Sequence, residues 1–477
     1  MQSVKKEKIL GIRRENKNKW ERRVALTPEA VKILVDSGIK VIVQPCNLRC
    51  STNKQYLEAG AEIEENIQLA DVIFGVKEIP LDFLFPNKTF IFFSHTFKGQ
   101  ISNMPALKTI LENNIRLIDY ELIKENKEVN PQRLVAFGKF AGIVGTIDFL
   151  QGIGDFLMYK KTYIPFLHTG FSYMYPSLEL AKKRISKVGE LLKREKINSK
   201  ILPLVFAVTG NGRVAKGSEE ILTLLPHKWI EPDDLQHLFD KNTNSNNECN
   251  DFVYLTRIEH KHMYCKKSET ERDAIYKTFD KEHFYANKKE YKSVFAEKYL
   301  PFLSVIFHCM YWDSDSPVII SDSEARNLAE EGRLRLIGIT DITCDFPVSS
   351  IELLKKTTTI ENPFYTIDPK TGSIEHDFKK MSKNSILYHA VDHLPSELPF
   401  ASSNHFSEKL LPFVKDILNS DYPCEYGSEL LPLEIQNACE TWNGKLCPKY
   451  EYLYKELSKY FVEYKELAES VERKKSK

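Results

Sequence analysis

The sequence predicts an α/β protein in which helices cover parallel β-sheets, and three observations support this. Short apolar runs alternate with helical stretches through the first 150 residues. The chain has 477 residues, too many for one hydrophobic core, so we expect at least two lobes. Further along, a buried strand runs straight into a glycine-rich turn and a helix, which indicates a Rossmann-like second lobe.

The elements of the first lobe follow from this alternation. Thr27-Pro28-Glu29 begins a helix, because it supplies an N-cap residue, a proline at the first helical position and an acid in the first turn. Continuous apolar strands are typical of a parallel sheet that is buried on both faces. We expect strands at Ile9–Ile12, Val41–Gln44, Val72–Val76, Thr89–Ser94 and Arg116–Tyr120, and helices at Pro28–Ser37 and Met104–Asn113.

The second lobe starts near residue 172 and carries the glycine-rich turn. Small residues over 138–154 predict a closely packed connecting helix before it, and a polar segment at about 240–300 is expected to be a surface insertion. Strands resume at Leu303–Cys309 and Leu334–Asp341. Beyond about residue 385 the pattern becomes helical, at Phe406–Leu418 and Tyr450–Val471.

Composition excludes several classes of function. With 67 basic and 66 acidic side chains, the net charge is +1 and the basic residues are interspersed, so we expect no nucleic-acid partner. Apolar runs fall short of the roughly 20 residues that span a bilayer, so we expect no membrane span. The N-terminus enters a strand at Ile9, which predicts a cytoplasmic protein unless a targeting segment was removed. Nine scattered cysteines predict reduced thiols.

The turn in Leu204–Gly217 has the order of elements that a dinucleotide pyrophosphate needs. Gly210 permits the tight turn, Gly212 lets backbone N–H groups approach the phosphates, and Ala215 fills the third small position. The helix N-terminus then faces the anion. Glu231 ends the next apolar run at the distance expected of a ribose-binding acid. The alternative is a tight strand-to-helix turn without a ligand. The candidate cofactor-binding residues of this region are Gly210, Gly212, Arg213, Val214 and Glu231.

Polar residues at strand ends are the candidates for chemistry, because ligands of open α/β sheets lie beyond the carboxyl ends of the strands. Val72–Val76 is followed by Lys77 and Glu78, and Thr89–Ser94 is followed by His95 and Lys98. If the two strands are neighbours, the amine of Lys77 and the imidazole of His95 lie side by side. One can then act as the acid and the other as the base in proton transfer. The alternative is a solvated lysine and a histidine that caps a strand.

Several charged residues complete this predicted site. Arg23 and Arg133 are candidates for gripping carboxylates, since a guanidinium matches a carboxylate as a planar fork. Asp119 and Glu121 follow another apolar run and would balance the cations. In the second lobe Asp341 and Asp345 lie at a strand end, where they are expected to face either the nicotinamide or the domain hinge, although helix capping is a comparable account of Asp345.

Two groups of potential metal ligands are weak. Cys46 and Cys50 form an isolated C-x-x-x-C, and His260, His262 and Cys265 lie close together in a polar segment. Neither supplies the four ligands of a structural zinc site, so we expect no metal.

A set of motifs spread over about residues 9–460 carries a family resemblance. They are Arg13–Pro28, Lys77-Glu-Ile-Pro80, Ser94-His-Thr-Phe-Lys98, Arg133–Gly142, the glycine turn and Asp392–Pro399, together with Arg116–Glu121, Tyr311-Trp-Asp and Thr358–Pro363. With these motifs the chain resembles the lysine-ketoglutarate reductase domain of aminoadipic semialdehyde synthase, of which the last three are typical. More broadly it is similar to lysine-forming saccharopine dehydrogenase and, distantly, to alanine dehydrogenase and the transhydrogenase nucleotide-binding subunit.

This resemblance implies two Rossmann-like domains with parallel sheets flanking an interdomain cleft. Residues 1–170 plus 385–477 would bind substrate, and 171–384 would bind the dinucleotide. It also implies the reaction, the reductive condensation of L-lysine with 2-oxoglutarate to saccharopine. Lys77 and His95 match the acid–base pair, Arg23, Lys98 and Arg133 the carboxylate-binding cations, and Glu78 and Glu121 the acids that moderate them.

The resemblance favours NADPH as cofactor, with NADH possible because Glu231 would repel a 2′-phosphate. Bifunctional relatives continue into a saccharopine-oxidising half, so a fused or separate partner of that kind is expected, and a mitochondrial location if a targeting segment was removed. Two alternatives remain open. One is an NAD-dependent lysine-forming saccharopine dehydrogenase, and the other is a non-catalytic nucleotide-binding or sensing subunit.

Overall fold

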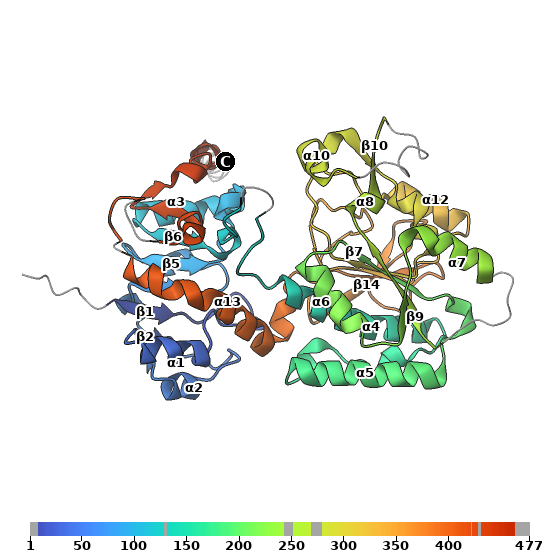
Figure 1. The fold of residues 1–477 in the computed structure, drawn as a ribbon, viewed down its shortest axis with the longest axis horizontal. Helices are drawn as coiled ribbons and strands as arrows, with labels where there is room; N and C mark the ends of the chain where they lie inside the picture. Colours follow the sequence, from blue (N-terminus) through green and yellow to red (C-terminus); the bar gives the residue numbers. More distant parts are fainter. Residues whose placement is uncertain are drawn as a thin grey trace, which may run out of the picture. The chain divides into compact units, whose positions relative to one another are not determined.

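The computed structural model describes residues 8–127, 131–242, 251–268, 279–420, 422–427 and 431–462. The chain divides into two compact units, and each is an α/β fold with its own eight-stranded sheet (Figure 1). Unit 1 is Met1–Phe137 with Pro399–Lys477, and unit 2 is Gly138–Leu398. The predicted α/β class with mainly parallel sheets is therefore confirmed, while the substrate and dinucleotide roles of the domains stay predictions.

The sheet of unit 1 has the strand order β18-β17-β6-β5-β4-β1-β2-β3. From β3 to β6 all neighbours are parallel, so the carboxyl ends of β4, β5 and β6 lie along one edge. The strands are β1 Ile9–Ile12, β2 Lys40–Val43, β3 Glu62–Ile63, β4 Val72–Phe74, β5 Thr89–Phe92, β6 Arg116–Asp119, β17 Cys439–Trp442 and β18 Lys445–Leu446.

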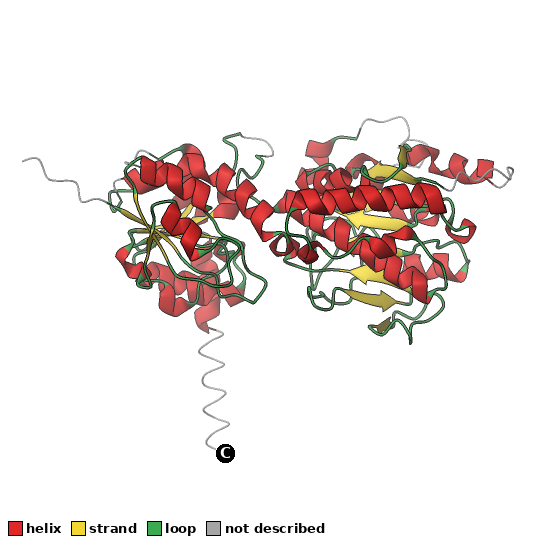
Figure 2. Cartoon of the chain, turned by 90° about the horizontal axis from the view of Figure 1, so that it is seen from below, coloured by secondary structure: helices red, strands yellow, loops and turns green. Residues whose placement is uncertain are grey.

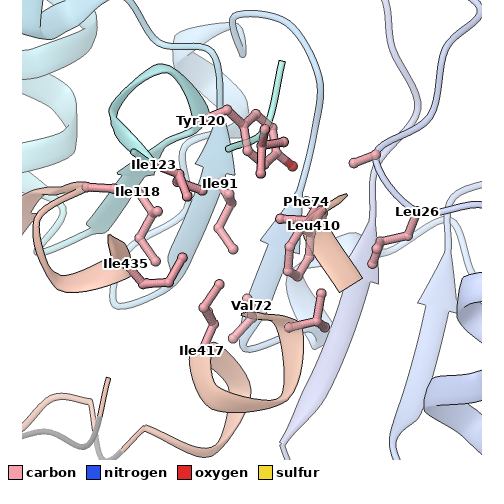
Figure 3. Close-up of a cluster of buried hydrophobic side chains, with 14 of the residues drawn as sticks. Leu26, Val72, Phe74, Ile91, Ile118, Tyr120, Ile123, Leu410, Ile417 and Ile435 are labelled. Carbon is pink, nitrogen blue, oxygen red and sulfur yellow. The ribbon is translucent and has the colours of Figure 1, made fainter. Parts of the chain in front are cut away.

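Helices cover this sheet, and the C-terminal segment completes it. Leu410 and Ile417 of α13 pack with Val72 and Ile91 of the sheet in one buried cluster (Figure 3). Each such side chain contributes about 1.5–3 kcal/mol when it is fully buried. The α-helices of unit 1 are α1 Pro28–Asp36, α2 Asn53–Glu58, α3 Met104–Glu112, α13 Pro399–Asn419 and α14 Leu433–Gln436.

The end of the chain contains a feature that the sequence pattern did not indicate. Strand β17 pairs antiparallel with β6 and extends the parallel sheet by a strand from the C-terminal segment. The helix predicted over Tyr450–Val471 is present at 453–462, and its remaining residues lie outside the described part of the chain.

Unit 2 holds a second sheet with the strand order β15-β14-β16-β13-β12-β7-β9-β8. Neighbours from β8 to β16 are parallel, and β14 and β15 are antiparallel. The strands are β7 Val205–Thr209, β8 His227–Trp229, β9 Val253–Ile258, β12 Val305–His308, β13 Gly338–Asp341, β14 Phe364–Ile367, β15 Ile374–Glu375 and β16 Ile386–His389, while β10 Tyr264–Lys266 and β11 Tyr291–Ser293 form a separate pair.

Helices and loops enclose the strands of unit 2 (Figure 2). The α-helices of this unit are α4 Gly138–Tyr159, α5 Leu178–Glu195, α6 Arg213–Leu222, α7 Leu235–Asn242, α8 His260–Met263, α10 Lys281–Ala286, α11 Phe295–Lys298 and α12 Asp322–Glu330. By length and composition α4 could cross a membrane, with mean hydropathy 1.3, but 89% of that window is buried inside the protein, which is the behaviour of a core helix.

Two glycines let α4 pack directly on α6, the helix that follows the glycine turn. A Cβ on Gly142 would lie 1.9 Å from the carbonyl oxygen of Val214, and one on Gly217 would lie 2.0 Å from that of Lys139. The predicted small-residue helix is thus present, and its close approach fixes the start of α6.

The segment at 240–300 differs from the expected surface insertion. Residues 253–258 form β9, which lies between β7 and β8 in the sheet. The physical reason is a short apolar run, Phe252–Ile258, whose signal the polar flanks obscured. Residues 243–250 and 269–278 of this segment lie outside the described part of the chain.

Candidate active site

Three neighbouring strands of unit 1 deliver the polar residues of the candidate site. Strand β4 leads to Lys77 and Glu78, β5 leads to His95, and β6 leads through Asp119 to Glu121. The strands pair in this order and in register, with Phe92 opposite Asp119. The condition set by the sequence, that these strands be neighbours, is therefore met.

A buried carboxylate shapes the turn that carries His95. Asp119 Oδ2 accepts hydrogen bonds from the backbone N–H of Ser94 at 2.8 Å and of His95 at 3.0 Å. Its Oδ1 accepts the N–H of Glu121 at 2.7 Å. His95 has φ of 58°, a left-handed conformation that a non-glycine residue keeps only where its surroundings hold it. Asp119 therefore fixes His95 and Glu121 relative to each other.

Glu121 is the centre of the charged cluster. One of its oxygens, Oε2, lies 3.0 Å from His95 Nδ1 and 3.3 Å from Lys98 Nζ. The other oxygen pairs with the guanidinium of Arg133. Burial alone would raise the pKa of Glu121, but the hydrogen bond with His95 and the charges of Arg133 and Lys98 outweigh it and lower the pKa to about 2. This carboxylate is ionised at neutral pH and orients the imidazole.

Glu78 lies on the other side of the imidazole. Its Oε1 is 3.8 Å from His95 Nε2, and its Oε2 is 3.4 Å from Lys17 Nζ. The two ring nitrogens of His95 thus face two different carboxylates.

The side-chain amine of Lys77 has no hydrogen-bond or ion-pair partner in the described part of the chain. Its backbone N–H donates to Glu15 Oε2 at 3.0 Å, but within the described residues its Nζ forms no hydrogen bond or ion pair. The side chain is half-buried, and a half-buried, uncommitted amine is available to bind or protonate a ligand.

Two buried acids near Lys77, Glu15 and Glu21, were not predicted from the sequence to belong to the site. Glu15 Oε1 and Oε2 accept the N–H groups of Val76 and Lys77, at 2.8 Å and 3.0 Å, and burial raises the pKa of Glu15. Burial also acts to raise the pKa of Glu21, but Arg23 outweighs it and, with Lys77, lowers that pKa. Glu15 lies three residues after the end of β1. The reasoning that selected Lys77, that polar residues after a strand are candidates for the site, would also have selected Glu15.

Arg23 is deeply buried and bound to the protein. Its Nε donates to Glu21 Oε1 at 2.8 Å, and its guanidinium lies 4.2 Å from the ring centre of Phe137. Arg133 is different, because 46% of its side chain is exposed beyond Glu121. The structure therefore gathers Glu78, His95, Lys98, Glu121 and Arg133 in one cluster and puts Arg23 beside Glu21. Their roles with a ligand stay predictions.

The glycine turn of unit 2 has the predicted form. Gly210 has φ of 79°, and its N–H donates to the carbonyl oxygen of Ile258 at 2.9 Å. Gly212 is the N-cap of α6, and a Cβ added there would meet nothing within 4 Å, so the space above the turn is open. Arg213 and Val214 form the first turn of the helix. Backbone N–H groups at a helix start with open space above them suit a phosphate.

An acid that contacts this turn is Glu259. Strand β9 lies next to β7, and Glu259 follows it directly, with Asn211 Nδ2 donating to Glu259 Oε2 at 2.9 Å. Glu231 follows β8, which is one strand further from β7. The expected spacing of about 20 residues selected Glu231, because the sequence does not reveal that β8 takes the edge and β9 takes the position beside β7.

Asp341 is the last residue of β13, and Asp345 lies in the turn that follows it. Asp341 is buried, and its Oδ1 accepts the hydroxyl of Thr343 at 2.7 Å and the N–H of Cys344 at 3.1 Å. Its Oδ2 accepts the hydroxyl of Tyr388 at 3.4 Å. Asp341 thus caps the turn that contains Asp345, and a contact of either residue with a nicotinamide stays a prediction.

Metal ligands do not gather in the part of the chain that the structure describes, where no group of three or more His, Cys, Asp or Glu side chains could hold an ion. Cys46 and Cys50, which lie in that part of the chain, are free cysteines.

Comparison with known proteins identifies the relatives of the chain. Residues 11–144 match the family model of the alanine dehydrogenase/PNT N-terminal domain. An alpha-aminoadipic semialdehyde synthase of Arabidopsis thaliana is 37% identical over 93% of this chain and 41% of that protein. The mitochondrial alpha-aminoadipic semialdehyde synthase of Bos taurus is 33% identical over 94% of this chain and 48% of that protein. The chain is thus similar over nearly its whole length to part of these alpha-aminoadipic semialdehyde synthases.

This finding confirms the resemblance seen in the motifs, although the chain spans less than half the length of these two relatives. A Yarrowia lipolytica protein named saccharopine dehydrogenase [NAD(+), L-lysine-forming] is 24% identical over 86% of this chain and 93% of its own. An L-alanine dehydrogenase structure, 14% identical with a TM-score of 0.58, covers 94% of this chain and 99% of its own, and it shows the fold alone.

Proposed function

We propose that the chain catalyses the reductive condensation of L-lysine with 2-oxoglutarate to saccharopine, with a reduced nicotinamide dinucleotide as hydride donor. The observation that carries the proposal is the contact of His95 with Glu121, flanked by Lys98, Arg133 and Glu78, in a homologue of alpha-aminoadipic semialdehyde synthase. The alternative of a non-catalytic sensor has no use for an oriented imidazole beside an uncommitted amine.

The chemistry requires both proton transfer and charge neutralisation. The ε-amine of lysine attacks the ketone of 2-oxoglutarate, the carbinolamine loses water to give an imine, and hydride addition gives the secondary amine. Amine attack needs a base and dehydration needs an acid, and in this proposal His95 and Lys77 fill these roles. The two substrates bring three carboxylates, which Lys98 and Arg133 would offset, while Arg23 is paired with Glu21.

The dinucleotide would bind at the glycine turn of unit 2, where it supplies the hydride. Gly210 and Gly212 leave room for the pyrophosphate, and the N–H groups of Arg213 and Val214 at the start of α6 face it. The nicotinamide end is expected near Asp341 and Asp345.

The proposal predicts a specific defect for His95→Gln. We expect lysine-dependent oxidation of the reduced nucleotide to fall by about 10²–10⁴ in kcat, because proton transfer is lost, while the Kd for the nucleotide stays unchanged. Absorbance of the reduced nucleotide follows turnover, and its fluorescence follows binding. His168→Gln, an exposed histidine of unit 2, is the matched control. Equal turnover of His95→Gln and wild type would refute the role of His95.

The cofactor is proposed to be NADPH, on the family resemblance. One observation favours the second candidate, an NADH-linked enzyme. Glu259 stands beside the glycine turn, where a carboxylate binds a ribose 2′-hydroxyl and repels a 2′-phosphate. Comparing kcat/KM for the two nucleotides decides between them. If Glu259 binds ribose, Glu259→Gln will lower kcat/KM for NADH and raise it for NADPH, whereas an unchanged ratio would leave Glu259 without this role.

A saccharopine-oxidising enzyme, fused or separate, would consume the product. A cytoplasmic location stays a prediction from the sequence, while the Bos taurus relative is named mitochondrial. Fractionation of cells that express the tagged full-length protein tests the location.

A further inference from the structure

Glu440 is a buried acid that the proposed chemistry does not use. It lies on β17, the antiparallel neighbour of β6, and its side chain is fully buried. The C-terminal segment thus brings a carboxyl group close to the loop that carries His95, although 345 positions separate the two residues in the chain. Burial of a carboxylate is costly unless it is paired or protonated, so this position needs an explanation.

Three hydrogen bonds between four oxygen atoms form a continuous chain from Glu440 to Asp119. Glu440 Oε2 lies 2.9 Å from Thr96 Oγ1, which lies 2.7 Å from Ser94 Oγ, which lies 2.6 Å from Asp119 Oδ2. Each distance is that of an O–H···O hydrogen bond. Asp119 also accepts the N–H groups of His95 and Glu121, so the chain ends on the group that holds the catalytic cluster.

Counting protons shows that one carboxyl group is protonated. Three hydrogen bonds need three protons, and the hydroxyls of Ser94 and Thr96 supply two. The third must come from Glu440 or Asp119. Burial raises the pKa of Asp119 as well, but Asp119 accepts three backbone N–H groups that favour its ionised form, whereas Glu440 Oε1 is buried with no hydrogen-bond partner among the described residues. The proton therefore belongs on Glu440.

We propose that Glu440 is a positioning residue that stays uncharged at neutral pH and donates a hydrogen bond to Thr96, which passes through Ser94 to the Asp119 carboxylate and thereby fixes the turn that bears His95. The inference rests on the proposed function only for the kinetic part of its test. In this arrangement Glu440 O–H donates to Thr96, Thr96 to Ser94, and Ser94 to Asp119.

The electrostatics of the surroundings support this assignment. Burial, with the charge of Asp119 added, raises the pKa of Glu440 to about 8. The other titratable groups that face Glu440 are Tyr450 and Tyr452. Tyr450 donates to the carbonyl oxygen of Asn437 and Tyr452 to that of Phe97, and burial raises the pKa of both phenols. Ionisation of Glu440 would therefore add a second buried negative charge beside Asp119 and remove the third proton.

The kinetic test uses Glu440→Gln and Glu440→Leu in the full chain. A glutamine amide can donate to Thr96 in place of the acid, so we expect kcat of Glu440→Gln at pH 7 within about twofold of wild type. In the wild type, ionisation of Glu440 should lower kcat above pH 8. Glu440→Gln should lack this part of the decline. Leucine cannot donate, so Glu440→Leu should lose about tenfold or more in kcat, with the KM for the nucleotide unchanged. Glu451→Gln, an exposed acid of the same segment, is the control.

A stability test works without any activity. A carboxyl group whose pKa is raised by folding stabilises the protein less as pH rises from its unfolded value toward its folded value. The Tm of wild type should therefore fall relative to that of Glu440→Gln between pH 5 and pH 9, while Glu451→Gln should follow wild type. A pH-independent gap, or a loss of kcat in Glu440→Gln as large as in Glu440→Leu, would overturn the inference. If wild type shows no lysine-dependent turnover, the proposed function fails, and the Tm comparison still decides the state of Glu440.

Discussion

Glu121→Gln tests the electrostatic account of the cluster most quantitatively. The folded protein lowers the pKa of Glu121 from 4.5 to about 2, which corresponds to a stabilisation of roughly 3 kcal/mol at neutral pH. Its partners Lys98 and Arg133 are partly exposed, at 38% and 46%, and solvent screens their contribution. We therefore expect Glu121→Gln to lower the free energy of unfolding at pH 7 by about 1–3 kcal/mol.

The pH dependence of this difference in the free energy of unfolding shows whether folding lowers or raises the pKa of Glu121. A carboxylate with a lowered pKa stabilises the protein above its unfolded pKa and loses this effect as pH falls, because the unfolded state binds protons first. The gap between wild type and Glu121→Gln should narrow by about 1 kcal/mol between pH 7 and pH 4. Urea unfolding followed by tryptophan fluorescence measures it, with Glu451→Gln as control. A gap that is absent, or equal at both pH values, would refute the reasoning.

Four further variants separate effects on binding from effects on folding. Arg23→Gln should lower stability by about 3–5 kcal/mol, because it leaves Glu21 buried and unpaired, whereas Arg133→Gln should keep stability within about 1 kcal/mol and raise the KM for 2-oxoglutarate. Gly142→Ala should destabilise by about 1–3 kcal/mol or more, since its Cβ would lie 1.9 Å from the carbonyl oxygen of Val214. Gly212→Ala, with open space around it, should keep the urea midpoint and weaken nucleotide binding in a fluorescence titration.

Local sequence patterns were sufficient to predict the strands and helices of the parallel core. Thr27-Pro28 starts α1, and the apolar runs before Lys77 and His95 are β4 and β5, because burial on both faces leaves a continuous apolar signal. Strand β17 escaped this reasoning. Its four residues contain Glu440 and Thr441, and only pairing with β6 makes them a strand.

The residues of the candidate site also divide into those that the sequence predicted and those that it did not. His95 and Glu121 were found because each follows an apolar run, and neighbouring parallel strands bring such residues together. Glu259 and Glu440 could not be found, because their positions depend on strand order, which is a tertiary property. Sequence spacing gives the order of elements along the chain but not which strand takes the edge of a sheet.

The central claim is that this chain joins the ε-amine of lysine to the ketone carbon of 2-oxoglutarate. The most direct measurement is mass spectrometry of the product formed by purified protein from isotopically labelled lysine, 2-oxoglutarate and reduced nucleotide. We predict labelled saccharopine in a one-to-one ratio with oxidised nucleotide, and a loss of both with His95→Gln. Oxidation of the nucleotide without a product that contains the lysine label would contradict the account.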